Sequence, residues 1–250
     1  MKSRRACYGY YGLPKLSVVI ALTLLVGVLL LYFASRLFGW IVIGFGFYVL
    51  LSYGVSITLL QRKREEDFPG ILRLEGDEHV LDVGCGLGRM TIVVAKKLKE
   101  GKVVGIDIWD RKELWSNSPE RAYANAELEG VRERVEFRYG SVLEIPFPDG
   151  TFDSVTCSSV LNNLSGRTPK SKALSEIYRV LKGGGKLLLL EPLRTLRMFF
   201  LFTPFAFWQL LNKDAWTRLL SKAGFVNLEF YYQDGVGLFL AEKPSKARAS

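Results

Sequence analysis

Two long runs of uncharged, mostly apolar residues open the chain, at residues 16–34 and 37–60. At a rise of 1.5 Å per residue, a 19-residue helix reaches about 28 Å, close to the hydrocarbon thickness of a bilayer. A signal peptide would have a shorter apolar core, and a pair of buried core helices would keep a polar stripe. The pattern therefore predicts a hairpin of two transmembrane helices within residues 1–60, joined at Ser35 and Arg36.

Basic residues flank both ends of this predicted hairpin, whereas the turn carries only Arg36. The flanking residues are Lys2, Arg4, Arg5 and Lys15 before it and Arg62, Lys63 and Arg64 after it. Basic residues next to membrane spans stay on the cytoplasmic side. We therefore expect a multi-pass membrane protein with both ends of the hairpin, and the rest of the chain, in the cytoplasm.

After a charged linker at residues 61–74, short apolar strands alternate with stretches of helical periodicity. The strands are predicted at residues 79–83, 102–107, 134–139, 152–157, 187–191, 226–231 and 237–242. The helices are predicted at residues 87–99, 119–129, 169–181 and 214–224. This order predicts an α/β domain over residues 75–243, with a mostly parallel sheet, helices on both faces and a closing strand pair. Residues 244–250 are expected to be a disordered tail.

Two helix ends are predicted from capping signals. The run Gly183-Gly184-Gly185 is suited to the C-cap of the helix at 169–181, since glycine readily adopts the left-handed conformation there. Asp214 is expected to be the N-cap of the helix that ends at Gly224.

The net charge of +9 is concentrated near the amino terminus, because residues 1–60 hold five basic and no acidic residues. This excess would attract anionic lipid headgroups, while the mixed charge of the remaining chain argues against a nucleic-acid partner. The three cysteines, Cys7, Cys85 and Cys157, form no C-x-x-C pair, and His79 is the single histidine. No metal site is therefore predicted.

The first predicted strand of the α/β domain ends in the glycine-rich turn Asp82-Val83-Gly84-Cys85-Gly86-Leu87-Gly88. Such a turn is either only a tight connection or a place where a small ligand approaches the backbone. Asp107 ends the second strand, where a carboxylate can accept two hydrogen bonds from a ribose diol. This geometry serves NAD and S-adenosylmethionine equally well.

The spacing D-x-G-x-G-x-G differs from the G-x-G-x-x-G of dinucleotide folds, and here the chain resembles the class I S-adenosylmethionine-dependent methyltransferases of the small-molecule and lipid branch. The resemblance spans residues 75–243 and rests on VLDVGCGLG, VVGIDIW, RVEFRYGSVLEIPFPDGTFDSV and IYRVLKGGGKLLLLEP, in that order. It implies a Rossmann-like, doubly wound sheet of seven strands, mostly parallel with an antiparallel last strand. It also implies S-adenosylmethionine as the cofactor and methyl transfer as the reaction.

The resemblance implies a role for each residue of the cofactor site. The glycines would let the chain pass close to the methionine part of the cofactor, and Asp82 would organise this loop and reach the amino group. Asp107 would hold the ribose hydroxyls, and Ile108 or Trp109 would pack on adenine. The complete implied set is Asp82, Gly84, Cys85, Gly86, Gly88, Asp107, Ile108, Trp109, Ser141, Val142 and Ser158.

One position of this set departs from the family pattern. Many relatives carry an aspartate at the position of Ser141, where it accepts from the adenine amino group, and a serine accepts less strongly. Val142 could offer its backbone N–H to the ring, and Ser158 would line the site at the end of the fourth strand.

Asn162, Asn163 and Glu191 are the catalytic candidates, because they lie at the carboxyl ends of the fourth and fifth strands. Many relatives carry one or two histidines near the two asparagines, so a general base is not assigned. Glu191 either deprotonates or orients the acceptor, or pairs with a lysine or arginine. His79 begins the first strand, at the end opposite the ligand, and is not expected to act in catalysis.

Residues 192–213, between the fifth strand and the next helix, are rich in Phe, Leu and Trp and too short to span a bilayer. They form either a core helix that covers the sheet or an interfacial lid with Arg194 and Arg197 at lipid headgroups. The sequence thus predicts a membrane-anchored methyltransferase with a small or membrane-resident acceptor, such as a lipid headgroup, a quinone precursor or another amphiphile. The alternatives are a membrane-tethered cofactor-binding protein without catalysis and an enzyme that acts on a soluble small molecule. An NAD-dependent oxidoreductase is disfavoured by the glycine spacing.

Overall fold

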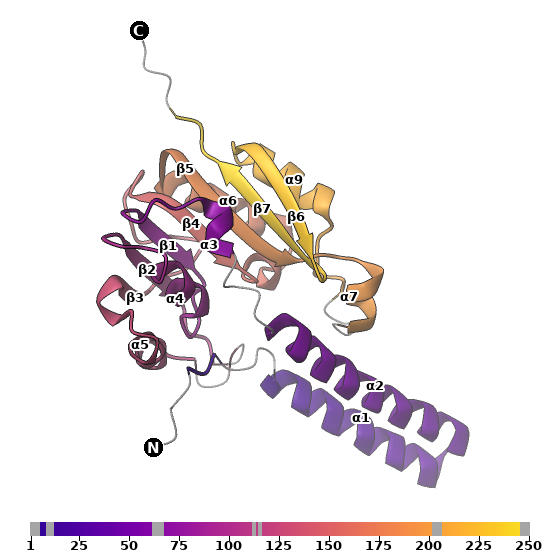
Figure 1. Ribbon diagram of the computed structural model, residues 1–250. Coiled ribbons are helices and arrows are strands. Elements are labelled where there is room, and N and C mark those ends of the chain that lie inside the picture. Colours follow the sequence, from indigo (N-terminus) through magenta and orange to yellow (C-terminus); the bar gives the residue numbers. More distant parts are fainter. Residues whose placement is uncertain are drawn as a thin grey trace.

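The computed structural model describes residues 6–8, 13–61, 68–111, 114, 117–201 and 207–245, which form a helical hairpin and an α/β domain (Figure 1). Several residues used in the sequence predictions lie outside this described part of the chain. They are Lys2, Arg4 and Arg5, residues 62–64, residues 202–206 within the apolar segment, and residues 246–250 of the tail.

The hairpin consists of α1 (Leu13–Phe33) and α2 (Arg36–Gln61), which lie side by side and extend away from the α/β domain (Figure 1). The predicted helical hairpin is therefore present. Its packing depends on glycines: a Cβ atom on Gly27 would lie 2.6 Å from Ile43 Cγ1, and one on Gly39 would lie 2.5 Å from Leu31 Cδ2. The two helices approach closely because these positions carry no side chain.

Apolar side chains cover the outside of the hairpin. Leu51 is 69% exposed and Trp40 is 64% exposed. Within the part of the chain that the structure describes, one helical stretch, Arg36–Val55, is long and apolar enough by length and composition to cross a membrane. Its mean hydropathy is 1.8 and 22% of it is buried, whereas a core helix would be mostly buried. The described apolar part of α1, Ser17–Phe33, is shorter.

The α/β domain is built on one seven-stranded sheet with the order β3-β2-β1-β4-β5-β7-β6. Its strands are β1 (His79–Val83), β2 (Lys102–Asp107), β3 (Val135–Tyr139), β4 (Phe152–Ser158), β5 (Leu181–Pro192), β6 (Val226–Gln233) and β7 (Val236–Glu242). The first five strands pair in parallel, and β7 pairs antiparallel with both β5 and β6. The predicted doubly wound sheet of seven strands, mostly parallel with an antiparallel last strand, is confirmed.

Helices cover both faces of the sheet, because the sheet strands are apolar on both sides. The helices are α3 (Phe68–Leu72), α4 (Arg89–Ala95), α5 (Pro119–Leu128), α6 (Arg167–Val180), α7 (Leu196–Leu201) and α9 (Lys213–Lys222), with short 3₁₀ helices at Arg132–Arg134 and Leu161–Asn163. Side chains of α3, α4 and α5 pack in one core cluster, and those of α6 and α9 pack in the other. The predicted linker at 61–74 thus includes α3.

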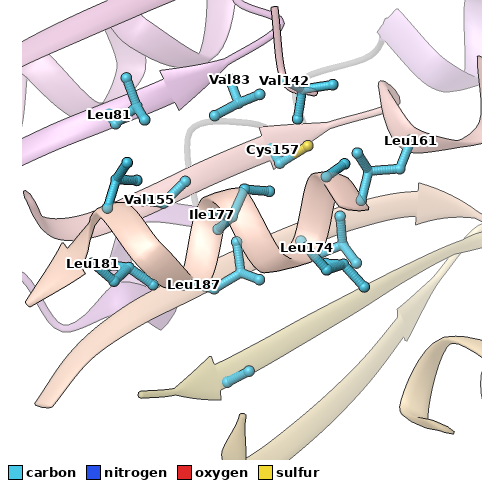
Figure 2. Packing of buried hydrophobic residues seen from close by; sticks show 14 of the residues in the cluster. Leu81, Val83, Val142, Val155, Cys157, Leu161, Leu174, Ile177, Leu181 and Leu187 are labelled. Atoms are coloured by element: carbon cyan, nitrogen blue, oxygen red, sulfur yellow. The ribbon is translucent and has the colours of Figure 1, made fainter. Parts of the chain in front are cut away.

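Successive side chains of β5 pack alternately into these two clusters. Leu187 and Leu189 pack on the side of α6, while Leu188 and Leu190 pack on the side of α4. Figure 2 shows the cluster on the side of α6, in which Ile177 of α6 lies over the central strands. The core therefore fixes the strands from both sides, and their carboxyl ends can carry loops without losing the fold.

Two predicted helix ends are wrong. The run Gly183–Gly185 is not a C-cap: α6 ends at Val180 and β5 begins at once, with Leu181 paired to Phe152. The glycines form an irregular start of β5, where a Cβ atom on Gly185 would lie 2.9 Å from the Asp153 carbonyl oxygen.

The second error concerns α9. Its N-cap is Asn212, whose side chain accepts a hydrogen bond from the Ala215 N–H at 3.0 Å, and Asp214 lies in the first turn instead. Both asparagine and aspartate are good caps, so the choice between neighbouring positions depends on where the chain leaves the preceding segment.

Candidate functional site

The predicted cofactor residues meet where β1, β2 and β4 end. β1 lies between β2 and β4 in the sheet, so the loops that follow these three parallel strands emerge at one edge. The chain continues from β1 to β2 on one side and returns from β3 to β4 on the other side of β1. Open α/β sheets bind ligands at such a switch in strand order. The glycine loop, residues 84–88, occupies the centre of this edge and runs into α4.

Four of the five backbone N–H groups of the glycine loop donate inside the protein. Those of Gly84 and Cys85 donate to the Ile106 carbonyl at 2.8 and 3.0 Å, and that of Gly88 donates to the Cys85 carbonyl at 2.8 Å. The Gly86 N–H donates to Asp107 Oδ2 at 2.8 Å. A phosphate-binding loop needs such groups free to point at the anion. This loop is therefore unsuited to a pyrophosphate and offers a ligand close backbone contact instead.

The loop glycines are also required by packing. Gly84, Gly86 and Gly88 have φ values of 70°, 53° and 83°, in the left-handed region that favours glycine. A Cβ atom on Gly84 would collide with the side chain of Val160, and one on Gly88 would lie 2.8 Å from Phe137 Cζ. The tight-turn and ligand-site interpretations are thus compatible, and the loop lies between Val160, which follows β4, and Phe137 of β3.

Asp107 connects the glycine loop to the loop after β2. Besides the Gly86 N–H, its carboxylate accepts from the Trp109 N–H at 2.6 Å and from Asn117 Nδ2 at 3.5 Å. A carboxylate has about four acceptor positions, so Asp107 can still accept from a ligand hydroxyl. Burial raises the pKa of Asp107, and the hydrogen bonds from Gly86 and Trp109 oppose this shift.

Ile108 and Trp109 differ in how they are held. Ile108 is 52% exposed at the edge of the site and is free to pack on a flat ring. Trp109 has φ 45°, unusual for a bulky residue, and its indole N–H donates to the Gly86 carbonyl at 3.2 Å. Backbone strain of this kind clusters at binding sites. The structure therefore places both predicted adenine-packing residues at the site, with Trp109 against the glycine loop.

Asp82 lies behind the glycine loop and is 1% exposed. Its two oxygens accept from Thr91 Oγ1 of α4 at 2.6 Å and from Thr156 Oγ1 of β4 at 2.9 Å. Burial raises its pKa to about 6. Asp82 therefore ties the loop to the neighbouring helix and strand, as predicted for an organising residue. Its contact with a ligand amino group stays a prediction.

The remaining predicted cofactor residues line the same edge with little freedom. Ser141 Oγ accepts from the Leu143 N–H at 3.2 Å, and Val142 is 9% exposed in the core. Ser158 is half-buried at the end of β4. Cys85 is buried beneath the loop, and burial raises the pKa of its thiol well above the usual value. Cys85 therefore contributes backbone and packing rather than a reactive thiolate.

Glu191 is fully buried and holds the loop that follows β4. Its Oε1 atom accepts from the Val160 N–H at 3.0 Å and from the Leu161 N–H at 2.7 Å. The sequence left an ion pair with a lysine or arginine as an alternative for Glu191. Among the described residues, no such pair within 4 Å is found. Burial raises the pKa of Glu191 to about 8. The acid is thus protonated at neutral pH and positions the backbone beside Gly84.

The two candidate asparagines differ in exposure. Asn162 is 7% exposed and its side-chain amide donates to the Pro192 carbonyl at 2.9 Å, whereas Asn163 is exposed. Within the described part of the chain, Asn162 Oδ1 and Glu191 Oε2 are buried without a hydrogen-bond partner. Buried polar atoms are nearly always paired, so each of these two atoms calls for a partner that the described residues do not supply.

Several site residues were missed from the sequence. Thr91 and Thr156 fix Asp82, Asn117 contacts Asp107, and Lys170 is a buried amine that donates to the Leu164 carbonyl near Glu191. Asn117 Oδ1 is also buried without a partner among the described residues, beside Asp107. No motif marks these positions. Only a polar residue on an otherwise apolar face, as with Lys170 on α6, hints at such a role.

His79 lies at the opposite edge of the sheet, as predicted. It begins β1, and its ring packs 4.6 Å from that of Phe152. An open polar hollow of about 450 Å³ at this edge is lined by Arg73, Asp153 and Lys182, among others. It is separated from the glycine loop by the length of the strands and does not belong to the site.

The strand order, the antiparallel β7 and the glycine loop followed by the Asp107 carboxylate together define a Rossmann-like methyltransferase fold. Residues 81–189 match the family model described as a methyltransferase domain. This part of the chain therefore resembles a methyltransferase domain and has the fold of S-adenosylmethionine-dependent methyltransferases. The acidic residues around the loop, and the internal hydrogen bonds of four of its N–H groups, fit a ligand that carries a sulfonium and an amino group rather than a pyrophosphate.

Similar proteins are named for quinone methylation. The chain is 32% identical over 148 residues to a demethylmenaquinone methyltransferase of Symbiobacterium thermophilum, covering 59% of this chain and 55% of that protein. It is 37% identical over 143 residues to a ubiquinone/menaquinone biosynthesis C-methyltransferase of Escherichia fergusonii, covering 57% and 51%. The chain thus spans about half the length of the curated relatives it matches.

Solved structures share the fold at low identity. A SAM-dependent methyltransferase from Aquifex aeolicus superposes with a TM-score of 0.60 at 21% identity, covering 78% of this chain and 96% of that one. The [4+2]-cyclase SpnF superposes with a TM-score of 0.57 at 21% identity, covering 72% and 80%. The same fold therefore supports more than one kind of chemistry.

Proposed function

We propose that this protein is a membrane-anchored methyltransferase that moves a methyl group from S-adenosylmethionine to an amphiphile resident in the membrane, with a quinone precursor as the leading candidate. The hairpin crosses the bilayer twice, and the α/β domain lies on its cytoplasmic side. The names of the relatives support a quinone-type acceptor, and the exposed apolar hairpin supports its location in the membrane.

The observation that carries this proposal is the contact between the hairpin and the apolar segment that follows β5. Tyr48 and Ser52 of α2 both donate hydroxyl hydrogen bonds to the Phe200 carbonyl of α7, at 2.9 and 3.0 Å. Carbonyls in the last turn of a helix lack partners within the helix, so these hydroxyls fasten α7 to α2. Figure 1 shows α7 beside the domain end of α2.

The segment around α7 presents apolar side chains next to this contact. Leu196 is 78% exposed and Trp208 is 73% exposed, whereas Met198 is buried against the domain. The segment thus combines the two predicted alternatives, with one side in the core and the other available to lipid. Arg197 pairs with Asp234 at 3.2 Å. An apolar surface at the junction of domain and hairpin favours an acceptor that arrives from the bilayer.

The residues of the site divide the work of methyl transfer. When bound, S-adenosylmethionine supplies an electrophilic methyl group on a positively charged sulfur. The glycine loop and Asp107 hold the cofactor, and Glu191 keeps the loop after β4 in place beside them. Asn162 Oδ1 is positioned to accept a hydrogen bond from an acceptor hydroxyl. Orientation of this kind can contribute roughly 7–11 kcal/mol to lowering the barrier.

Two alternatives make different predictions about the product. A tethered cofactor-binding protein transfers no methyl group, and an enzyme for soluble acceptors labels only water-soluble compounds. The [4+2]-cyclase with the same fold shows why labelled transfer, rather than cofactor binding, must be measured.

The test uses the full chain in lipid bilayers with S-adenosylmethionine carrying a tritiated methyl group. Extracted membrane lipids, including a demethylated quinone, and soluble metabolites are offered in separate reactions. We expect label in the lipid fraction, lowered severalfold by combining Leu196→Gln with Trp208→Gln. Leu128→Gln on α5, 49% exposed in the wild type, is the matched control and should leave transfer unchanged. Label only in the soluble fraction, or none at all, would contradict the proposal.

A further inference from the structure

The short segment that precedes the hairpin, Ala6–Tyr8, lies against the cofactor side of the α/β domain. The Cys7 N–H donates to Asn125 Oδ1 at 3.0 Å, and Asn125 Nδ2 donates back to the Cys7 carbonyl at 3.0 Å. One side-chain amide thus pairs with both polar groups of a backbone residue 118 positions away. This segment is called the strap below.

The same asparagine also holds the glycine loop. Asn125 Nδ2 donates to the Leu87 carbonyl at 2.9 Å, between Gly86 and Gly88. Asn125 is 5% exposed, so its amide would be costly to leave unpaired. A change in the position of the strap therefore alters the hydrogen bond from Asn125 to the Leu87 carbonyl, which supports the loop.

Tyr8 makes a second connection to this loop. The Arg89 guanidinium, at the first residue of α4 and directly after Gly88, lies over the Tyr8 ring at 4.9 Å from its centroid. Tyr8 also packs on the core cluster that includes Cys85 and Trp109. The strap thereby contacts residues on both sides of the glycine loop.

We propose that the strap completes the cofactor site, so that affinity for S-adenosylmethionine depends on residues outside the methyltransferase domain and on the hairpin that carries them. Only residues 9–12 connect Tyr8 to Leu13 of α1, and these five steps span at most about 18 Å. The hairpin therefore limits where the strap can be, and the contacts of Tyr48 and Ser52 with Phe200 fasten the hairpin to the domain. This inference concerns the cofactor and is independent of the identity of the acceptor.

The first experiment measures cofactor affinity by calorimetry on the full chain in lipid nanodiscs, without an acceptor. Deletion of residues 2–8 should raise the dissociation constant about tenfold, and Tyr8→Ala about threefold. Tyr32→Ala removes an aromatic side chain that is 81% exposed at the far end of α1, and it should have no effect. Unchanged affinity in both the deletion and Tyr8→Ala would overturn the proposal, provided that wild-type protein binds the cofactor.

The second experiment fastens the strap reversibly. In Asn125→Cys, the new side chain lies beside the Cys7 backbone. Oxidation by diamide is used to join the two sulfurs in a disulfide, while diamide takes up the two electrons and two protons. Cys85 and Cys157 are buried and should not compete. We expect weak cofactor binding after reduction by dithiothreitol and recovery of at least threefold after oxidation. Equal affinity in the two states, with the disulfide verified by mass, would show that docking of the strap is irrelevant to the site.

Discussion

Asp107 joins the glycine loop to the loop after β2, at the place where we expect the ribose of the cofactor to bind. Its carboxylate already accepts from the backbone of Gly86 and Trp109. Because these bonds use part of its acceptor capacity, a ligand adds to an existing network instead of building one. A site assembled before the ligand arrives loses less conformational freedom on binding.

Replacement of Asp107 by alanine should weaken S-adenosylmethionine binding by about 1.5–3 kcal/mol, roughly 10- to 150-fold, since hydrogen bonds to a charged group are removed. The measurement is calorimetry on purified full chain. Asp77→Ala, an exposed acid before β1, is the control and should bind as the wild type does. Wild-type affinity in Asp107→Ala would remove this residue from the cofactor site.

Glu191 is the second residue whose environment determines its chemistry. With its pKa raised from 4.5 to about 8, the folded protein keeps a proton that the unfolded chain loses above about pH 4.5. Stability from this group is therefore fully present below pH 4.5 and is lost as the pH rises toward 8. The pKa of Glu191 is raised because the side chain is buried and no cation among the described residues lies within ion-pair distance of it.

Glu191→Gln keeps the acceptor for the Val160 and Leu161 N–H groups and removes the titration. The melting temperature of the variant relative to the wild type should therefore rise between pH 4.5 and 8 and level off above that range. Thermal unfolding from pH 4 to 9 measures this difference. Asp82 titrates in both proteins, so its contribution cancels in the difference between their melting temperatures. Parallel curves for the two proteins would mean that Glu191 is not protonated in the fold.

At the scale of elements, the hairpin shows how glycines decide which faces of two apolar helices meet. Both helices are apolar all round, so hydrophobicity alone does not choose a face. Gly39 lies against Leu31, with a virtual Cβ atom 2.8 Å from the Leu31 backbone nitrogen, whereas nothing lies within 4 Å of one on Gly44. The contact face is therefore set by where side chains are missing.

Gly39→Leu should separate α1 from α2 and lower the unfolding temperature in detergent or nanodiscs, at a cost of about 1–3 kcal/mol for overpacking. Gly44→Leu adds the same side chain five residues along α2, where the space is open, and should change the temperature little. Both variants are compared with the wild type by thermal unfolding. Equal effects of the two substitutions would show that the helices do not pack as described.

At the scale of the whole molecule, the described part of residues 1–61 contacts the domain through the strap at Asn125 and through α2 at Phe200. These contacts fix the domain relative to the hairpin. If the hairpin spans the bilayer, the carboxyl edge of the sheet stays beside one leaflet. A tether of this kind raises the effective concentration of acceptors on that surface only.

The expected topology follows from the basic residues that flank the hairpin. In a Cys7→Ser background, a cysteine at Ser35 should react with a membrane-impermeant maleimide added to intact cells, and one at Ser245 should react only after lysis. Cys85 and Cys157 are 6% and 0% exposed and should stay silent. Labelling of position 245 in intact cells would reverse the orientation.

The sequence alone determined the order of strands and helices, the antiparallel end of the sheet, the apolar hairpin and the place of the glycine loop. These are local properties, because periodicity, apolar length and motif spacing are read within a short stretch of chain. The start of β5 was missed because its glycines resemble a helix end until β4 and Lys243 are seen on either side.

Only the tertiary structure decided which polar groups meet. Asn125 gives no sign in the sequence that it joins residues 7 and 87, and Glu191 gives none that it holds the backbone of Val160. The cost of burying a polar group depends on partners that the chain brings from far away, so the role of such a residue is fixed after folding. The cofactor loop was therefore visible from the sequence, and what supports it was not.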